Sequence, residues 1–139
     1  ISIRFILTEV SANHNMIMGA WDSDNFISWL GSLADQVRIQ DNGNNNIIWD
    51  VGRVATDTVY ELAFTNDGTN WELYINAGSK GQEAIVDDLV INTFGDGLSS
   101  SAEFGMTGQI ADIRIYKRVL TASEIKQLYL SKFNPIGLI

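Results

Sequence analysis

Hydrophobic and polar residues alternate along most of the chain, and this two-residue period predicts β-strands. The first run places on one face Ile1, Ile3, Phe5 and Leu7. Similar runs cover residues 16–20, 25–31, 36–41, 47–51, 58–65, 71–76, 87–94 and 110–116. Turn-forming residues separate them at intervals of roughly 8 to 12 residues, a spacing typical of antiparallel sandwiches and barrels. The pattern therefore predicts an all-β, antiparallel protein.

The clearest local signal is a hairpin. An Asp-Gly pair at 67–68 lies between the runs 58–65 and 71–76, and Asp-Gly between two alternating segments favours a tight turn. By the same alternation, Glu61 and Glu72 are expected on a solvated face of the hairpin.

The period changes at Leu120, where the sequence predicts a helix of about two to three turns. Thr121 can cap the first backbone N–H groups, and Glu124, three residues later, can reach back to the N–H of the cap. Leu120 and Ile125 occupy the positions of a hydrophobic staple. A narrow apolar stripe is formed by Ile125, Leu128 and Tyr129, so the helix is expected to lie on the sandwich rather than inside it.

The strand before this helix, 110–116, has two distinct faces. Alternation places Ala111, Ile113 and Ile115 on the inner face. Asp112 and Arg114 share the other face, two residues apart. They are expected to have a structural role and to pair with each other or with the helix.

The composition of the chain excludes several classes of function. The 139 residues, 45% hydrophobic and 19% charged, fit one globular domain without an apolar run of about 18 residues, which excludes membrane insertion. The net charge of −8 argues against nucleic acid, whose phosphates require clustered Lys and Arg. There is no cysteine, so disulfides and thiolate chemistry are excluded.

Three segments in this order resemble the concanavalin A-like jelly rolls of the laminin G and pentraxin type. They are VYELAFTNDGTNWELYIN at 59–76, FGDG at 94–97 and GQIADIRIYKRVLTASEIKQLY at 108–129. The resemblance implies a two-sheet antiparallel jelly-roll sandwich with one short C-terminal helix. It implies a single domain over 1–135 and a tail at 136–139.

Two departures from the family pattern stand out. The usual Asn-Gly after the tyrosine strand is replaced by Asn76-Ala77-Gly78, and the usual opening strand upstream of residues 1–9 is absent. The second departure implies an unpaired sheet edge that another part of a parent chain, or a partner, would cover.

The resemblance also implies a calcium site. Asp24 and Asn25 resemble the Asp-Asn pair that pentraxins use as calcium ligands, and Asp96 lies where their second acidic cluster occurs, although the consecutive triplet is not present. Asp22 can add a fourth oxygen ligand. The alternative is that all four residues form turns, because Asp and Asn bond their own backbone.

The aromatic residues suggest a sugar-binding role. An exposed indole can stack on a pyranose, and Trp21 and Trp71, beside polar turns, are the candidates; core packing is the alternative. Trp29 and Trp49 lie within strand runs and are expected to be packed.

Catalysis is not indicated. His14 is the single histidine, and the E-x-D-x-x-E spacing of related glycoside hydrolases is absent. The sequence predicts a noncatalytic carbohydrate-binding or adhesion module of a larger extracellular, cell-surface or virion-surface protein, with calcium as candidate cofactor and a glycan or neighbouring subunits as partners. The alternative is a structural jelly roll of a virion, fibre or surface assembly that mediates protein contacts.

Overall fold

The computed structural model describes residues 1–10, 14–20, 25–30, 35–41, 45–84, 89–95 and 105–131. These residues form ten strands and one helix: β1 (Ser2–Leu7), β2 (His14–Gly19), β3 (Phe26–Leu30), β4 (Gln36–Gln40), β5 (Asn46–Asp50), β6 (Val59–Asn66), β7 (Asn70–Ile75), β8 (Gly78–Ala84), β9 (Thr93–Phe94), β10 (Gly108–Arg114) and α1 (Ala122–Ser131).

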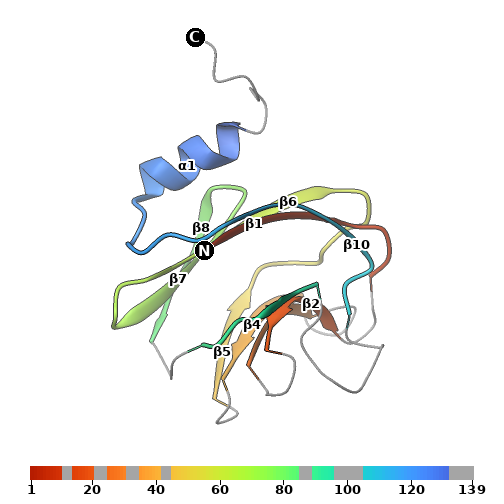
Figure 1. Cartoon of the computed structure of the whole chain (residues 1–139), viewed down its shortest axis with the longest axis horizontal. Helices are drawn as coiled ribbons and strands as arrows, with labels where there is room; N and C mark the ends of the chain where they lie inside the picture. Colours follow the sequence, from red (N-terminus) through yellow and green to blue (C-terminus); the bar gives the residue numbers. More distant parts are fainter. Residues whose placement is uncertain are drawn as a thin grey trace.

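The strands form two five-stranded antiparallel sheets packed face to face. One has the order β10-β1-β6-β7-β8 and the other β5-β4-β3-β2-β9. The helix α1 lies on the outer side of the first sheet, away from the second (Figure 1). We call the first the helix-side sheet and the second the opposite sheet. The predicted two-sheet jelly-roll sandwich with one C-terminal helix is confirmed.

The inward-facing residues of both sheets make one hydrophobic core. Phe5 in β1 and Phe64 in β6 are buried there. Trp29 and Trp49, the two tryptophans expected to be packed, are buried beside them. Their indole N–H groups are satisfied by backbone carbonyls, at 3.1 Å from Trp29 to Gly52 and 3.1 Å from Trp49 to Gly81. Burial of these rings removes large apolar surfaces from water and holds the two layers together.

The predicted hairpin is confirmed as β6 and β7. Its turn is fixed by side chains that accept backbone N–H groups: Asn66 Oδ1 from Gly68 at 2.8 Å, and Asp67 Oδ1 from Thr69 at 2.8 Å and from Asn70 at 2.7 Å. Gly68 has φ +91°, which glycine adopts without a Cβ clash.

β8 was not predicted. It continues from β7 through a two-residue turn in which Asn76 and Ala77 both have positive φ, as a type I′ turn requires. All seven of its residues are exposed, and its sequence, GSKGQEA, has no alternation of apolar and polar residues that would predict a strand. Asn76 Oδ1 accepts the backbone N–H of Glu61 at 2.9 Å, which ties this turn to β6.

A β-bulge changes the predicted faces of β10. Ile113 pairs with Ile3, but Ile110 pairs with Phe5, so Ala111 is the additional residue of the bulge and is exposed. Ile115 lies beyond the strand and is 67% exposed. The inward placement of Ala111 and Ile115 was therefore wrong, whereas the predicted pair of Asp112 and Arg114 is confirmed at 2.7 Å.

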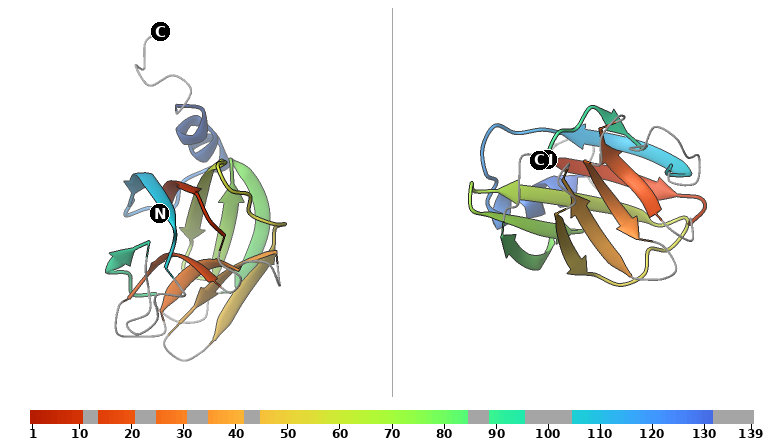
Figure 2. Two further views of the ribbon diagram at one scale, coloured as in Figure 1. Left: turned by 90° about the vertical axis from the view of Figure 1, so that its right-hand side faces the viewer. Right: turned by 90° about the horizontal axis from the view of Figure 1, so that it is seen from below.

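The helix begins as predicted. Glu124 Oε2 accepts the Thr121 N–H at 2.8 Å, and Thr121 Oγ1 accepts the Glu124 N–H at 3.3 Å, which is a capping box. Leu120 and Ile125 are buried together with Ala63 and Tyr74 on the outer face of the helix-side sheet. The helix therefore covers part of that face (Figure 2).

Beneath the helix lies a buried ion pair. Arg4 Nη2 in β1 donates to Glu61 Oε2 in β6 at 2.7 Å and to the Leu128 carbonyl of α1 at 3.3 Å. Glu61 is only 3% exposed, so its expected solvated position was wrong. The alternation gave the correct side of the strand, but α1 covers that side.

Removal of one partner should destabilise the domain strongly, because the other charge is left buried. We expect Arg4→Met to lower the free energy of unfolding by about 3 kcal/mol, measured by urea denaturation. The double variant Arg4→Met/Glu61→Leu should recover most of the loss. If the Arg4→Met variant were as stable as the wild type, the ion pair would not contribute to the free energy of unfolding.

Candidate functional site

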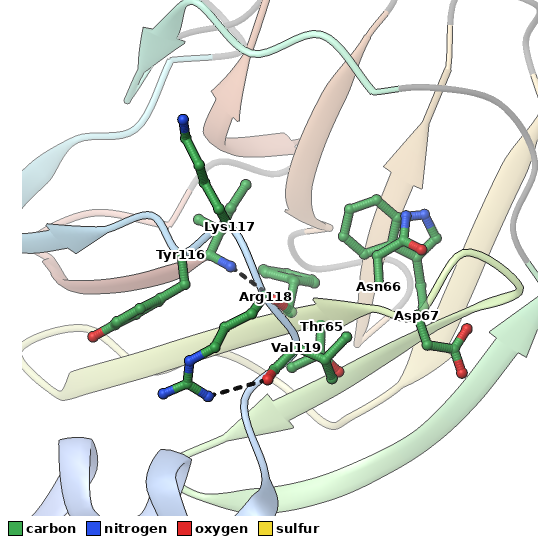
Figure 3. Close-up of a pocket in the computed structure, with 10 residues that line it drawn as sticks. Thr65, Asn66, Asp67, Tyr116, Lys117, Arg118 and Val119 are labelled. Carbon is green, nitrogen blue, oxygen red and sulfur yellow. Dashed lines mark hydrogen bonds between the residues drawn. The ribbon is translucent and has the colours of Figure 1, made fainter.

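Two hollows lie on either side of the segment 115–119, which connects β10 to α1. The first, which we call the hairpin hollow, has a volume of about 380 Å³. It lies between this segment and the β6–β7 hairpin (Figure 3). It is lined by Ile1, Phe64, Thr65, Asn66, Asp67, Trp71, Tyr116, Lys117, Arg118 and Val119. The lining combines hydroxyl, amide, carboxylate and cationic groups with aromatic rings, the mixture that binds polar organic ligands.

Asp67 is an anion whose Oδ1 already accepts two backbone N–H groups. The backbone N–H groups of Asn70 and Thr69 hold the pKa of its carboxyl below its usual range. Figure 3 shows its carboxylate directed away from Lys117, which extends from the other side of the hollow. Asp67 therefore fixes the turn, while its charge lies apart from the Lys117 ammonium.

The second hollow, which we call the helix hollow, has a volume of about 350 Å³. It lies against α1 and is lined by Arg114, Tyr116, Arg118, Leu120, Glu124, Gln127, Leu128 and Ser131. Tyr116 and Arg118 therefore line both hollows.

Arg118 is held in place by α1. It donates to Glu124 Oε2 at 2.9 Å and Oε1 at 2.6 Å, and to the Val119 carbonyl at 3.3 Å. Hydrogen bonding from Arg118 is the largest cause, and the bond from the Thr121 N–H the second largest, of the lowering of the Glu124 pKa to about 2. Three of the five guanidinium donors are thus used within the protein.

Tyr116 is the aromatic residue that sequence reasoning missed. It is partly buried against the Ala63, Tyr74, Leu120 and Ile125 cluster and lines both hollows. In the sequence it closes a predicted strand, on the same face as Asp112 and Arg114, and nothing local marks it as part of a binding site. Only the approach of the β6–β7 hairpin and α1 makes it part of a site.

Of the predicted site residues, two are described. Trp71 lines the hairpin hollow but is only 7% exposed, so it belongs mainly to the core and offers the hollow little of its ring. Asn25 is buried just before β3. The other candidates, Trp21, Asp22, Asp24 and Asp96, lie outside the described residues.

Strand register bears on the predicted calcium ligands. The Asn25 carbonyl accepts the Ala20 N–H, and the Asn92 N–H donates to the Gly19 carbonyl. The N–H of Gly95, which precedes Asp96, donates instead to the Ile17 carbonyl, two residues before Gly19 in β2. Within the described ranges there is no group of three His, Cys, Asp or Glu residues placed to hold a metal.

A family model described as the concanavalin A-like lectin/glucanases superfamily (Laminin_G_3) matches residues 1–126. No curated protein sequence matches the chain.

Several solved structures share the fold at low identity. Domain 4 of AbnA, a GH43 extracellular arabinanase of Geobacillus stearothermophilus solved with arabinotriose, is 20% identical with a TM-score of 0.71, over 92% of this chain and 64% of its own. A heptameric SAP-like pentraxin of Limulus polyphemus is 13% identical (TM-score 0.67, 92% and 68%). The ligand-binding domain of botulinum neurotoxin serotype D, solved with N-acetylneuraminic acid, is 19% identical (TM-score 0.66, 94% and 35%). The chain thus spans less than two thirds of the arabinanase domain and about a third of the toxin domain.

The lowered pKa of Glu124 predicts a pH dependence of stability. Its contribution should be complete above its usual pKa of 4.5 and should be lost as the pH falls towards about 2. The stability difference between the wild type and Glu124→Gln, measured by urea denaturation, should therefore shrink between pH 6 and pH 2.5. Glu83→Gln, in exposed β8, controls for the general loss of a carboxylate. An unchanged Glu124→Gln difference across this range would contradict the assignment.

Proposed function

Because the chain belongs to the concanavalin A-like lectin/glucanases superfamily, we propose that it is a noncatalytic carbohydrate-binding module of a larger extracellular or surface protein. The observation that carries the proposal is the hairpin hollow, where hydroxyl, amide and charged groups surround Tyr116 and the edge of Trp71. Sugars require this combination, since their hydroxyls need hydrogen-bond partners and their C–H faces pack on aromatic rings.

The similar structures support a sugar ligand. One is a domain of an arabinanase in complex with arabinotriose, and another is a toxin domain in complex with N-acetylneuraminic acid. At these identities they establish the fold alone, so the position of the ligand in this chain is argued from its own residues.

The carboxylates of the two hollows support a binding role over a catalytic one. Asp67 and Glu124 both have lowered pKa values, because N–H groups and Arg118 bond their charged forms. A glycosidase needs one carboxyl with a raised pKa to protonate the leaving group. Neither residue has an environment that would raise it.

The structure contains no helix, within its described residues, of the length and apolarity needed to cross a bilayer. We propose that the module acts outside the cell, or on a cell or virion surface, a location that suits a glycan ligand.

A second candidate function is a structural jelly roll that contacts neighbouring subunits. It is favoured by the edges of the helix-side sheet. β8 is exposed along its whole length, and beyond β10 lie Ile115, 67% exposed, and Val119, 46% exposed. Exposed edges of this kind can pair with another chain.

The glycan proposal is tested by a glycan array followed by calorimetry with the best ligand. Thr65→Val keeps the shape and β-propensity of the side chain but removes its hydroxyl from the hairpin hollow. We expect it to weaken binding by about fivefold, the effect of one hydrogen bond. Thr56→Val, in an exposed turn that lines neither hollow, should not change the affinity. Absence of any glycan ligand, together with self-association in analytical ultracentrifugation, would favour the structural role instead.

We also propose that calcium binds at Asp22, Asp24, Asn25 and Asp96, the ligands that the resemblance to pentraxins implies. Calcium should then raise the thermal midpoint by several degrees relative to EDTA, because it binds only the folded state. Asp24→Asn should abolish that shift. A midpoint that calcium and EDTA leave equal would refute the calcium site and leave the hairpin hollow unaffected.

A further inference from the structure

The two hollows lie next to each other, on either side of Tyr116 and Arg118, which line both of them. A ligand in the hairpin hollow that extends past Tyr116 therefore enters the helix hollow. Two neighbouring hollows suit a chain of sugar units better than a single unit.

The charge of this surface differs from that of the protein. The side chains that line the two hollows include three cations, Arg114, Lys117 and Arg118, and two carboxylates, Asp67 and Glu124, which gives a net charge of +1. The whole chain carries −8. When Asp112, the partner of Arg114 at 2.7 Å, is counted with them, the surface is neutral. It therefore repels an anion less than the rest of this acidic protein does.

Most of these charges are already neutralised by partners. Arg114 pairs with Asp112 at 2.7 Å, and Arg118 pairs with Glu124 at 2.6 Å. Asp67 is bonded by backbone N–H groups of its own turn. Lys117 is exposed and takes part in none of the ion pairs among the described residues.

On these grounds we propose that the ligand is an acidic oligosaccharide that crosses Tyr116 and places a carboxylate or sulfate against the Lys117 ammonium. This inference rests on the proposed glycan-binding function and specifies the ligand class. Lys117 suits the role because its ammonium is a mobile point charge on a flexible stem, whereas Arg118 is fixed by Glu124. The Asp67 carboxylate, directed away from Lys117 in Figure 3, opposes such an anion only weakly.

The test compares matched ligands. The array carries uronate, sialate and sulfate glycans beside their neutral parents, and calorimetry then compares the best acidic ligand with its methyl ester or desulfated form. We expect the acidic form to bind at least fivefold more tightly, with an affinity that falls as salt rises.

Variants of Lys117 separate the charge from the fold. Lys117→Gln should remove about fivefold of affinity for the acidic ligand and none for its neutral form, and Lys117→Arg should retain the preference. Lys126→Gln, an exposed lysine of α1 that lines neither hollow, is the matched control and should bind as the wild type does. Equal binding of the acidic and neutral forms, unchanged in Lys117→Gln, would overturn this inference and leave the glycan-binding function intact. Binding to no glycan at all would overturn both.

Discussion

The ion pair between Arg4 and Glu61 links the three elements on which the rest of the helix-side sheet depends. It joins β1 to β6, and the same guanidinium donates to the Leu128 carbonyl in the last turn of α1. Carbonyls in that turn lack a backbone N–H partner within the helix and accept other donors. The Leu128 carbonyl accepts the Ser131 hydroxyl at 2.6 Å as well as the Arg4 guanidinium. A buried charge pair contributes less through net attraction than through the cost of any arrangement that separates it. The helix is therefore held in one position on the sheet.

This position defines the segment 115–119. At one end the segment continues β10, which pairs with β1, and at the other it enters α1 through the capping box. Both ends are fixed, so Tyr116, Lys117 and Arg118 are held between the β6–β7 hairpin and the helix. The two hollows form because both ends of this segment are fixed, and a change in the position of α1 on the sheet would alter both hollows.

The sequence predicted the fold well because strand alternation and helix capping are local signals. It could not predict β8, whose exposed residues carry no apolar period and whose existence depends on the turn at Asn76 and Ala77. It misplaced Glu61, because alternation assigns a residue to a side of the sheet without showing whether another element covers that side. It also misassigned the faces of β10, because the bulge at Ala111 inserts one residue into the alternation and nothing in the composition indicates such an insertion.

The candidate site was less predictable for a related reason. Tyr116 and Thr65 are 51 positions apart in the chain, and neither belongs to a motif that joins them. Trp71 was selected for its position beside a turn, and the structure places it at the hollow but mainly in the core. Sequence reasoning favours residues with strong individual chemistry, whereas this surface arises from ordinary residues that the fold brings together.

The hydrogen bonds around the hollows also determine how a ligand would be bound. Asn66 and Asp67 are fixed by the backbone of their own turn, and Arg118 by Glu124, before any ligand arrives. Binding to such groups costs little further side-chain entropy, so the affinity depends mainly on the contacts themselves. Lys117 differs, because its flexible stem must become ordered when it meets an anion, and that cost offsets part of the electrostatic gain. Under the proposed function, the fixed residues would therefore set the shape that the ligand must match, and Lys117 would add a modest preference for charge.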